Sequence, residues 1–157
     1  MIPQFSELTE DEKALMFDVP VLATILIAGA DNCIDKYEKQ VATELTKYKS
    51  ITSEPQLQDY FAYVSSNFRE RLEQLIAELP GKAKFRNPYI REQLTKVNAI
   101  IVKINPEFST EFYKSIKEIA RYVGEASGGV LGYLTISKAE ARALNNLEMI
   151  LDPKNIK

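Results

Sequence analysis

The stretch VPVLATILIAGADNCIDKYE, residues 19–38, joins the most apolar segment of the chain to a tight acidic turn. Its first part, Val19 to Ala30, is an apolar run of about 12 residues, which includes Pro20 and Thr24. A helix that spans a membrane needs about 20 apolar residues, so the run is too short for that role. It predicts instead a helix over residues 20–30 that is buried in the core of a globular protein.

Side chains that cap helix N-termini recur along the rest of the chain. In a capping box, an N-cap oxygen accepts the amide three residues on, and a Glu at that position accepts the amide of the cap. Three such pairs predict helices that begin near residues 9, 35 and 137: Thr9 with Glu12, Asp35 with Glu38, and Ser137 with Glu140. Proline is favourable at the first helical position, where an amide would have no partner. Three further starts follow from it: Ser53 with Pro55, Asn87 with Pro88, and Asn105 with Pro106.

Between these starts the apolar residues recur every three or four positions, as they do on one face of an amphipathic helix. The longest such run, residues 54–79, predicts the central helix on which the others pack. The glycines at 128 and 129 are expected to end a helix, with residues 130–136 as an apolar connector. We therefore predict an all-α, single-domain bundle over residues 1–157, with about seven helices around one long central helix. The predicted ranges are 9–17, 20–30, 35–50, 54–79, 88–104, 106–127 and 137–151.

The composition is that of an ordinary globular domain, with 45% hydrophobic and 27% charged residues. The formal net charge is −2, but residues 1–80 carry −7 and residues 81–157 carry +5, counted from the sequence. We expect most of these charges to lie on solvated helix surfaces; a molecule with one acidic and one basic face is the alternative. The single cysteine, Cys33, has no partner for an intramolecular disulfide and favours a reducing, cytoplasmic location.

Catalytic motifs are missing from the sequence. The chain has no histidine, the side chain best suited to proton transfer near neutral pH, and Cys33 therefore has no histidine to activate it. The Glu-x-x-His pairs of di-iron helical bundles are excluded for the same reason. The glycines at 128, 129 and 132 lack the Lys-Ser/Thr of a phosphate-binding loop. We expect a protein that binds a partner and is not an enzyme.

One stretch mixes basic and aromatic residues. Lys82, Lys84, Arg86 and Arg91 alternate with Phe85 and Tyr89, a pattern that can hold a nucleic-acid backbone against stacking aromatics. Four charges over ten residues are few in a protein of pI near 5.4. We expect a solvated loop between helices with Phe85 packed in the core, and no nucleic-acid partner.

The turn after the apolar run resembles the signature of the tellurite-resistance TerB-like family. In that family a small apolar helix ends in Ala-Asp-Gly, followed by a polar residue, Ile or Val, Asp and a later Glu. The matching residues here are Ala30, Asp31, Ile34, Asp35 and Glu38. A second element, Ile136-Ser137 followed by Glu140, is similar to a further part of the signature. Two positions depart from it: Asn32 replaces the usual Gly, and Cys33 replaces a polar or acidic residue.

The resemblance implies an all-α fold, a link to stress-response or membrane-associated complexes, and an acidic functional surface. It implies no reaction. Asn tolerates the left-handed conformation, so the turn is expected to survive at Asn32.

The acidic turn has three interpretations that the sequence leaves open. Asp35 and Glu38 can serve as helix caps, Asp31, Asp35 and Glu38 can form a patch for a protein partner, or the same three carboxylates can bind calcium or magnesium weakly. The segment fails as an EF-hand loop, because Cys33 and Lys36 occupy its third and sixth positions. The leading hypothesis is a non-catalytic helical interaction module, with Glu140 as a second acidic element.

Overall fold

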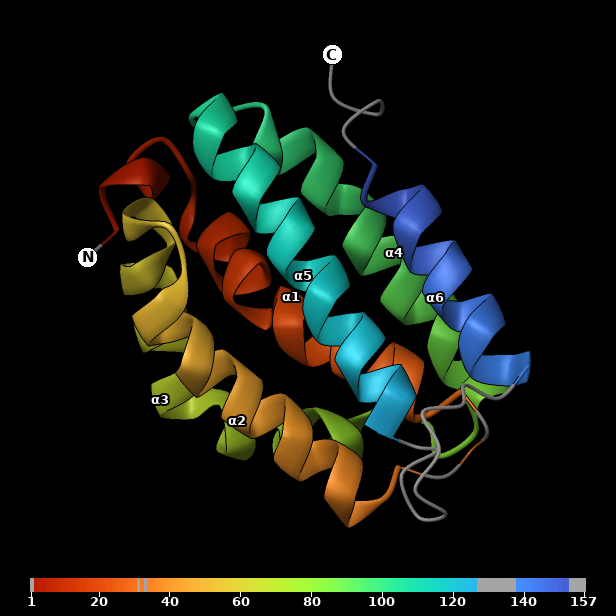
Figure 1. The fold of residues 1–157 in the computed structure, drawn as a ribbon. Helices are drawn as coiled ribbons and strands as arrows, with labels where there is room; N and C mark the ends of the chain where they lie inside the picture. The colour runs from red at the N-terminus through yellow and green to blue at the C-terminus, as the bar shows by residue number, and fades with distance from the viewer. Residues whose placement is uncertain (1, 31, 33, 127–137, 153–157) are drawn as a thin grey trace.

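The fold consists of helices joined by short connections (Figure 1). The computed structural model describes residues 2–30, 32, 34–126 and 138–152. Within these residues there are six α-helices and no strand, which confirms the predicted all-α class. After a 3-10 turn at Pro3–Phe5 come α1 (Glu10–Ala28), α2 (Lys36–Thr52), α3 (Pro55–Glu78), α4 (Ala83–Ile101), α5 (Pro106–Ala126) and α6 (Lys138–Ile150).

The central helix is α1, which packs against all five other helices. In Figure 1 it lies behind α5, with α2 and α3 on one side and α4 and α6 on the other. Every residue from 19 to 29 is buried, as expected for a helix that is apolar on all sides. The prediction that residues 54–79 form the central helix is therefore wrong. The corresponding helix, α3, is the longest within the described residues, at 24 residues, but it packs mainly on α1, α2 and α5 and exposes one side.

The predicted break between residues 17 and 20 is also wrong, because α1 continues through Pro20. Proline has no amide to donate to the carbonyl four residues earlier, which here belongs to Met16. The buried hydroxyl of Tyr60 on α3 donates to that carbonyl at 2.5 Å. Burial raises the pKa of Tyr60 well above its usual 10, so the hydroxyl remains a donor at neutral pH. Two predicted helices thus become one, and the described residues contain six helices where about seven were expected for the chain.

The start of α4 differs from the prediction as well. Asn87 does not cap a helix at Pro88, because α4 begins at Ala83 and Pro88 lies in its second turn. The amide of Ala83 donates to the Oδ1 atom of Asn32 at 2.7 Å, so the N-terminal amide of this helix is satisfied by a distant turn. A cap supplied from 51 residues away leaves no local pattern for sequence reasoning to find.

Three of the predicted local caps are present, whereas α3 begins at Pro55 as expected but has no side-chain cap from Ser53. Thr9 with Glu12 and Asp35 with Glu38 both form complete capping boxes. Asn105 accepts the amide of Glu107 at 2.7 Å, ahead of a helix that begins at Pro106. Ser137 and the predicted connector 130–136 lie outside the described residues.

The bond between Tyr60 and Met16 generates a test of this fold. Tyr60→Phe should lower the free energy of unfolding by about 1–3 kcal/mol, because a buried carbonyl loses its donor. Pro20→Ala supplies the missing helical amide, so the same Tyr60→Phe change should cost at most half as much in that background. Urea denaturation of the two single variants and the double variant measures the coupling. Tyr48→Phe, at a residue that is 63% exposed, is the control. Additive effects of Tyr60→Phe and Pro20→Ala would contradict this account of how α1 passes Pro20.

Candidate functional site

The acidic turn holds the first group of predicted site residues. The Oδ1 atom of Asp35 accepts the amide of Glu38 at 2.8 Å, and the Oε1 atom of Glu38 accepts the amide of Asp35 at 3.1 Å. Glu38 is buried, and so is Glu140 in the first turn of α6. Asp31 and Cys33 lie outside the described residues. Among the residues that are described, no group of three or more His, Cys, Asp or Glu side chains is arranged to hold a metal ion.

The same turn is fastened to α4 by Arg86, which is only 4% exposed. Its Nη2 atom donates to the carbonyl of Gly29 at 2.7 Å, and its Nη1 atom donates to the carbonyl of Gly81 at 3.1 Å. Burial lowers the pKa of Arg86 from its usual value. Asn32 adopts the left-handed conformation expected of it, with φ of 68°. Arg86 therefore serves the C-terminal end of α1 and is not available to a phosphate.

Its neighbour Phe85 was expected in the core, and this expectation is wrong: Phe85 is 62% exposed. Successive residues of a helix point about 100° apart, so only one of the two can face the end of α1. The carbonyls there require a donor, which a phenyl ring cannot supply, and the arginine takes the buried position. Lys84 lies over the exposed ring, with its Nζ atom 5.6 Å from the centroid.

The close approach of Arg86 to Gly29 predicts the effect of adding one methyl group. A Cβ atom on Gly29 would lie 2.2 Å from the Nη2 atom of Arg86 and 2.7 Å from the carbonyl oxygen of Ile25. Gly29→Ala should therefore lower the free energy of unfolding by about 1–3 kcal/mol. Gly81→Ala is the matched control, since a Cβ atom there meets nothing within 4 Å and should change stability by no more than about 0.5 kcal/mol. Equal effects in chemical denaturation would show that the contact between Arg86 and Gly29 does not constrain the turn.

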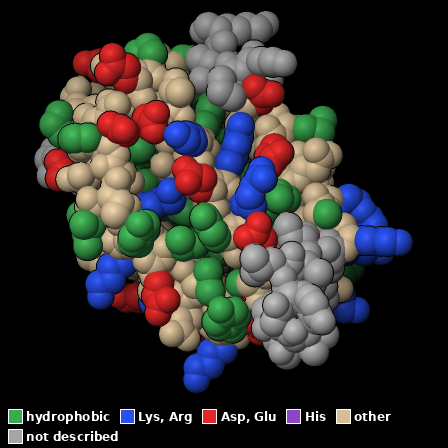
Figure 2. All heavy atoms as spheres, in the orientation of Figure 1, with side chains coloured by type: hydrophobic (Ala, Val, Ile, Leu, Met, Phe, Trp, Pro, Cys, Tyr) green, Lys and Arg blue, Asp and Glu red, His purple; other side chains and the backbone are tan. Residues whose placement is uncertain are grey.

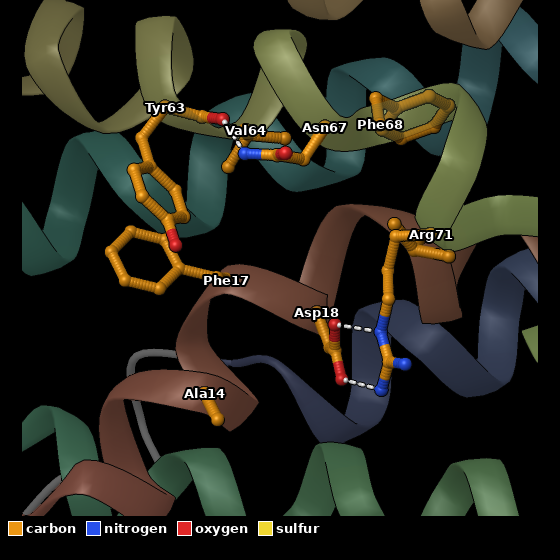
Figure 3. A pocket seen from close by; sticks show the side chains of 9 residues that line it. Ala14, Phe17, Asp18, Tyr63, Val64, Asn67, Phe68 and Arg71 are labelled. Carbon is orange, nitrogen blue, oxygen red and sulfur yellow. Dashed lines mark hydrogen bonds and ion pairs between the residues drawn. The ribbon is translucent and has the colours of Figure 1, made fainter. Parts of the chain in front are cut away.

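A furrow with two adjoining cavities lies between α1 and α3 on the described surface. Its first cavity, of about 230 Å³, has apolar walls that include Phe17, Val21, Val64 and Phe68. Figure 3 shows Phe17 and Asp18 on α1 facing Tyr63 and Arg71 on α3. An apolar hollow with a few fixed polar groups at its rim is typical of a binding site.

The polar end of this cavity is an ion pair with two parallel hydrogen bonds. The Nε and Nη2 atoms of Arg71 each donate to one oxygen of Asp18 at 2.8 Å (Figure 3). These bonds to Asp18 raise the pKa of Arg71. The paired geometry fixes the side chain that closes one end of the furrow.

Beyond the first cavity the furrow widens toward the N-terminus. Phe17 and Tyr63, whose ring centroids lie 4.1 Å apart, form the boundary with a second cavity of about 600 Å³. Ile2 and Phe5 contribute to its apolar part, and Glu10, Lys13 and Asp59 form its polar rim. A third hollow lies on the other side of α1, against α4. The exposed first half of α1 is thus flanked by hollows on both sides.

Sequence reasoning missed the furrow, although one signal for it exists. Asp59, Tyr63, Asn67 and Arg71 recur every four residues along α3, on a face next to the buried one. Such a stripe does not reveal what lies opposite. The partner of Arg71, Asp18, is 53 residues away in the chain.

Comparisons with protein-family models, with curated proteins and with solved structures find no match to this chain. A search of the described residues for a helix long and apolar enough to cross a membrane also finds none. The furrow and the acidic turn are therefore the two candidate functional surfaces of the described residues.

Proposed function

We propose that this chain is a non-catalytic helical interaction module, and that a protein partner docks in the furrow between α1 and α3. The observation that carries the proposal is the row of two adjoining apolar cavities, which a fixed ion pair closes at one end. Tyr63, which is 52% exposed, stands between the cavities with its ring against Phe17. Large aromatic side chains of this kind are favoured anchors of protein interfaces.

The resemblance of the acidic turn to the TerB-like signature supports a role in a stress-response complex. It adds no reaction to the proposal. The acidic residues Asp35 and Glu38 have a structural task as a capping box, so the furrow is the stronger candidate for the docking surface.

The test places a photo-crosslinking amino acid at Asn67, an exposed residue that lines the first cavity. Irradiation of cells that make the full chain should link position 67 to one or a few proteins, which mass spectrometry identifies. A second substitution, Ala14→Arg, fills the furrow with a long charged side chain and should abolish these links. Ala141→Arg, at an exposed position on α6, is the matched control and should leave them in place. Links that survive Ala14→Arg would exclude the furrow as the docking surface.

The alternative function is weak binding of calcium or magnesium by Asp31, Asp35 and Glu38. Asp35 and Glu38 begin the same helix, with their side chains one turn apart, and carboxylate oxygens suit these hard cations. One side-chain oxygen of Asp35 and one of Glu38 already accept capping amides, so we expect a low affinity for the cation.

A cation that binds only the folded chain raises its melting temperature by mass action. Millimolar calcium or magnesium should then raise the melting temperature of the unsubstituted chain, and Asp31→Asn should remove the rise. A melting temperature that does not respond to either cation would leave the turn as a pair of helix caps.

A further inference from the structure

The second cavity of the furrow combines an apolar base with an acidic rim. Ile2 and Phe5, which line it, are only 5% and 1% exposed and therefore belong to its base. Glu10 and Asp59 also line the cavity, and both are exposed residues at its rim. A group that fills this cavity therefore needs an apolar part for the base and a polar part that carboxylates attract for the rim.

The charges at this rim do not cancel. Among the described residues that line the cavity, Lys13 alone is basic, and its Nζ atom pairs with Glu10 at 3.3 Å. No ion pair joins Asp59 to another residue within the described part of the chain. The rim therefore has one carboxylate in excess, which attracts a cation and repels an anion.

The aromatic walls favour the same sign of charge. Phe17 and Tyr63 pack with their ring centroids 4.1 Å apart (Figure 3), and the centroids of Phe5 and Phe17 are 5.5 Å apart. All three rings line the second cavity. An aromatic ring attracts an ammonium or guanidinium group that lies over its face within about 6 Å of the centroid. The walls and the rim thus both favour a cationic group.

On another charged face of the molecule the two signs are matched. On the face that includes α5, Lys49 pairs with Glu118 at 3.7 Å, and Arg121 pairs with Glu148 at 3.1 Å. Figure 2 shows Lys and Arg side chains next to Asp and Glu side chains there. The second cavity differs from this face, because Asp59 at its rim has no cation of the described chain paired with it.

Lysine and arginine side chains have the two parts that the second cavity requires. Their methylene stems bury against apolar surfaces while the charged head stays near water. A leucine would fill the base but leave Asp59 without a cation, and a glutamate would be repelled by it. The first cavity shares Ala14, Phe17 and Tyr63 with the second and has apolar walls. An apolar side chain of the same segment therefore fits beside the basic one.

We infer that the partner protein inserts a lysine or arginine side chain into the second cavity. Its stem lies against Phe5 and Phe17, and its charged head lies between Asp59 and Glu10. A neighbouring apolar side chain of the same segment occupies the first cavity. The inference rests on the proposed docking function and adds the chemistry that the partner must present.

The first experiment compares two small molecules with the same alkyl stem, hexylammonium and hexanoate. Each is titrated at low salt into the isotope-labelled full chain, and the amide resonances are followed by NMR. Hexylammonium should shift the resonances of Lys13, Asp59 and Tyr63. It should bind at least about tenfold more tightly than hexanoate, which corresponds to about 1.4 kcal/mol. Equal affinity of the two molecules at these resonances would overturn the inference.

Variants of Asp59 assign the preference to the rim. Asp59→Asn should weaken the binding of hexylammonium by about threefold to fivefold, the effect of one exposed charge pair. Asp59→Lys should abolish the preference for the cation. Glu70→Gln is the matched control, because Glu70 is an exposed carboxylate on the same helix that does not line either cavity. Equal effects of Asp59→Asn and Glu70→Gln would show that only the net charge of the protein matters.

The second experiment uses the partner itself, through the photo-crosslinks from position 67. Asp59→Lys should lower their yield at least about tenfold, and Glu70→Lys should leave the yield unchanged. Mass spectrometry of the linked peptide should find a lysine or arginine beside an apolar residue. Exchange of that basic residue for glutamate in the partner should restore the links to the Asp59→Lys chain, which a merely structural effect of Asp59→Lys would not allow.

The remaining outcomes separate this inference from the docking function. If the links persist unchanged in Asp59→Lys, the docking function stands and the inferred basic side chain is wrong. If position 67 forms no links while hexylammonium still binds, the docking function fails and the inference fails with it. The cavity would then be a site for a small organic cation.

Discussion

The buried second half of α1 is the constraint on which the rest of the structure depends. From residue 19 to residue 29 this helix has no solvent-facing side, so other helices must enclose it completely. Its backbone polar groups must also find partners inside the protein, because water does not reach them. At two places a backbone carbonyl lacks its usual helical partner. Pro20 has no amide to donate to the carbonyl of Met16, and the helix ends at Gly29. The hydroxyl of Tyr60 donates to the carbonyl of Met16 at 2.5 Å, and the guanidinium of Arg86 donates to the carbonyl of Gly29 at 2.7 Å.

The same two bonds position the neighbouring helices. Tyr60 ties α3 to α1 in the middle of an aromatic cluster that includes Phe5, Phe61 and Phe112. Arg86 ties the start of α4 to the end of α1, and Asn32 adds a second link to Ala83. Because α3 and α4 are held to α1 in this way, the exposed first half of α1 is left between them, with the furrow on its α3 side. The furrow is thus a consequence of enclosing only half of α1.

Local sequence patterns could predict those parts of the fold that depend on residues close in the chain. The capping boxes at Thr9 and Asp35, the cap at Asn105 and the helical class all follow from spacings of two to four residues. The continuation of α1 through Pro20 and the start of α4 at Ala83 depend on Tyr60 and Asn32, which lie 44 and 51 residues away from the groups that they bind. Phe85 shows the same limit. Its apolar side chain predicted burial, and only the distant carbonyl of Gly29 explains why Arg86 is buried in its place.

The division of charge along the sequence coincides with a turn in the fold. The chain turns back between α3 and α4 near residue 80, which is also where the acidic half of the sequence ends and the basic half begins. Helices α1, α2 and α3 therefore lie in the acidic half, and α4, α5 and α6 lie in the basic half. The expectation that most of these charges lie on solvated helix surfaces stays a prediction, and an ion pair, Lys103 with Glu12 at 2.8 Å, joins the basic half to the acidic half. The fold thus lets opposite charges that are 91 residues apart in the chain pair with each other, so a division of charge along the sequence need not be a division in space.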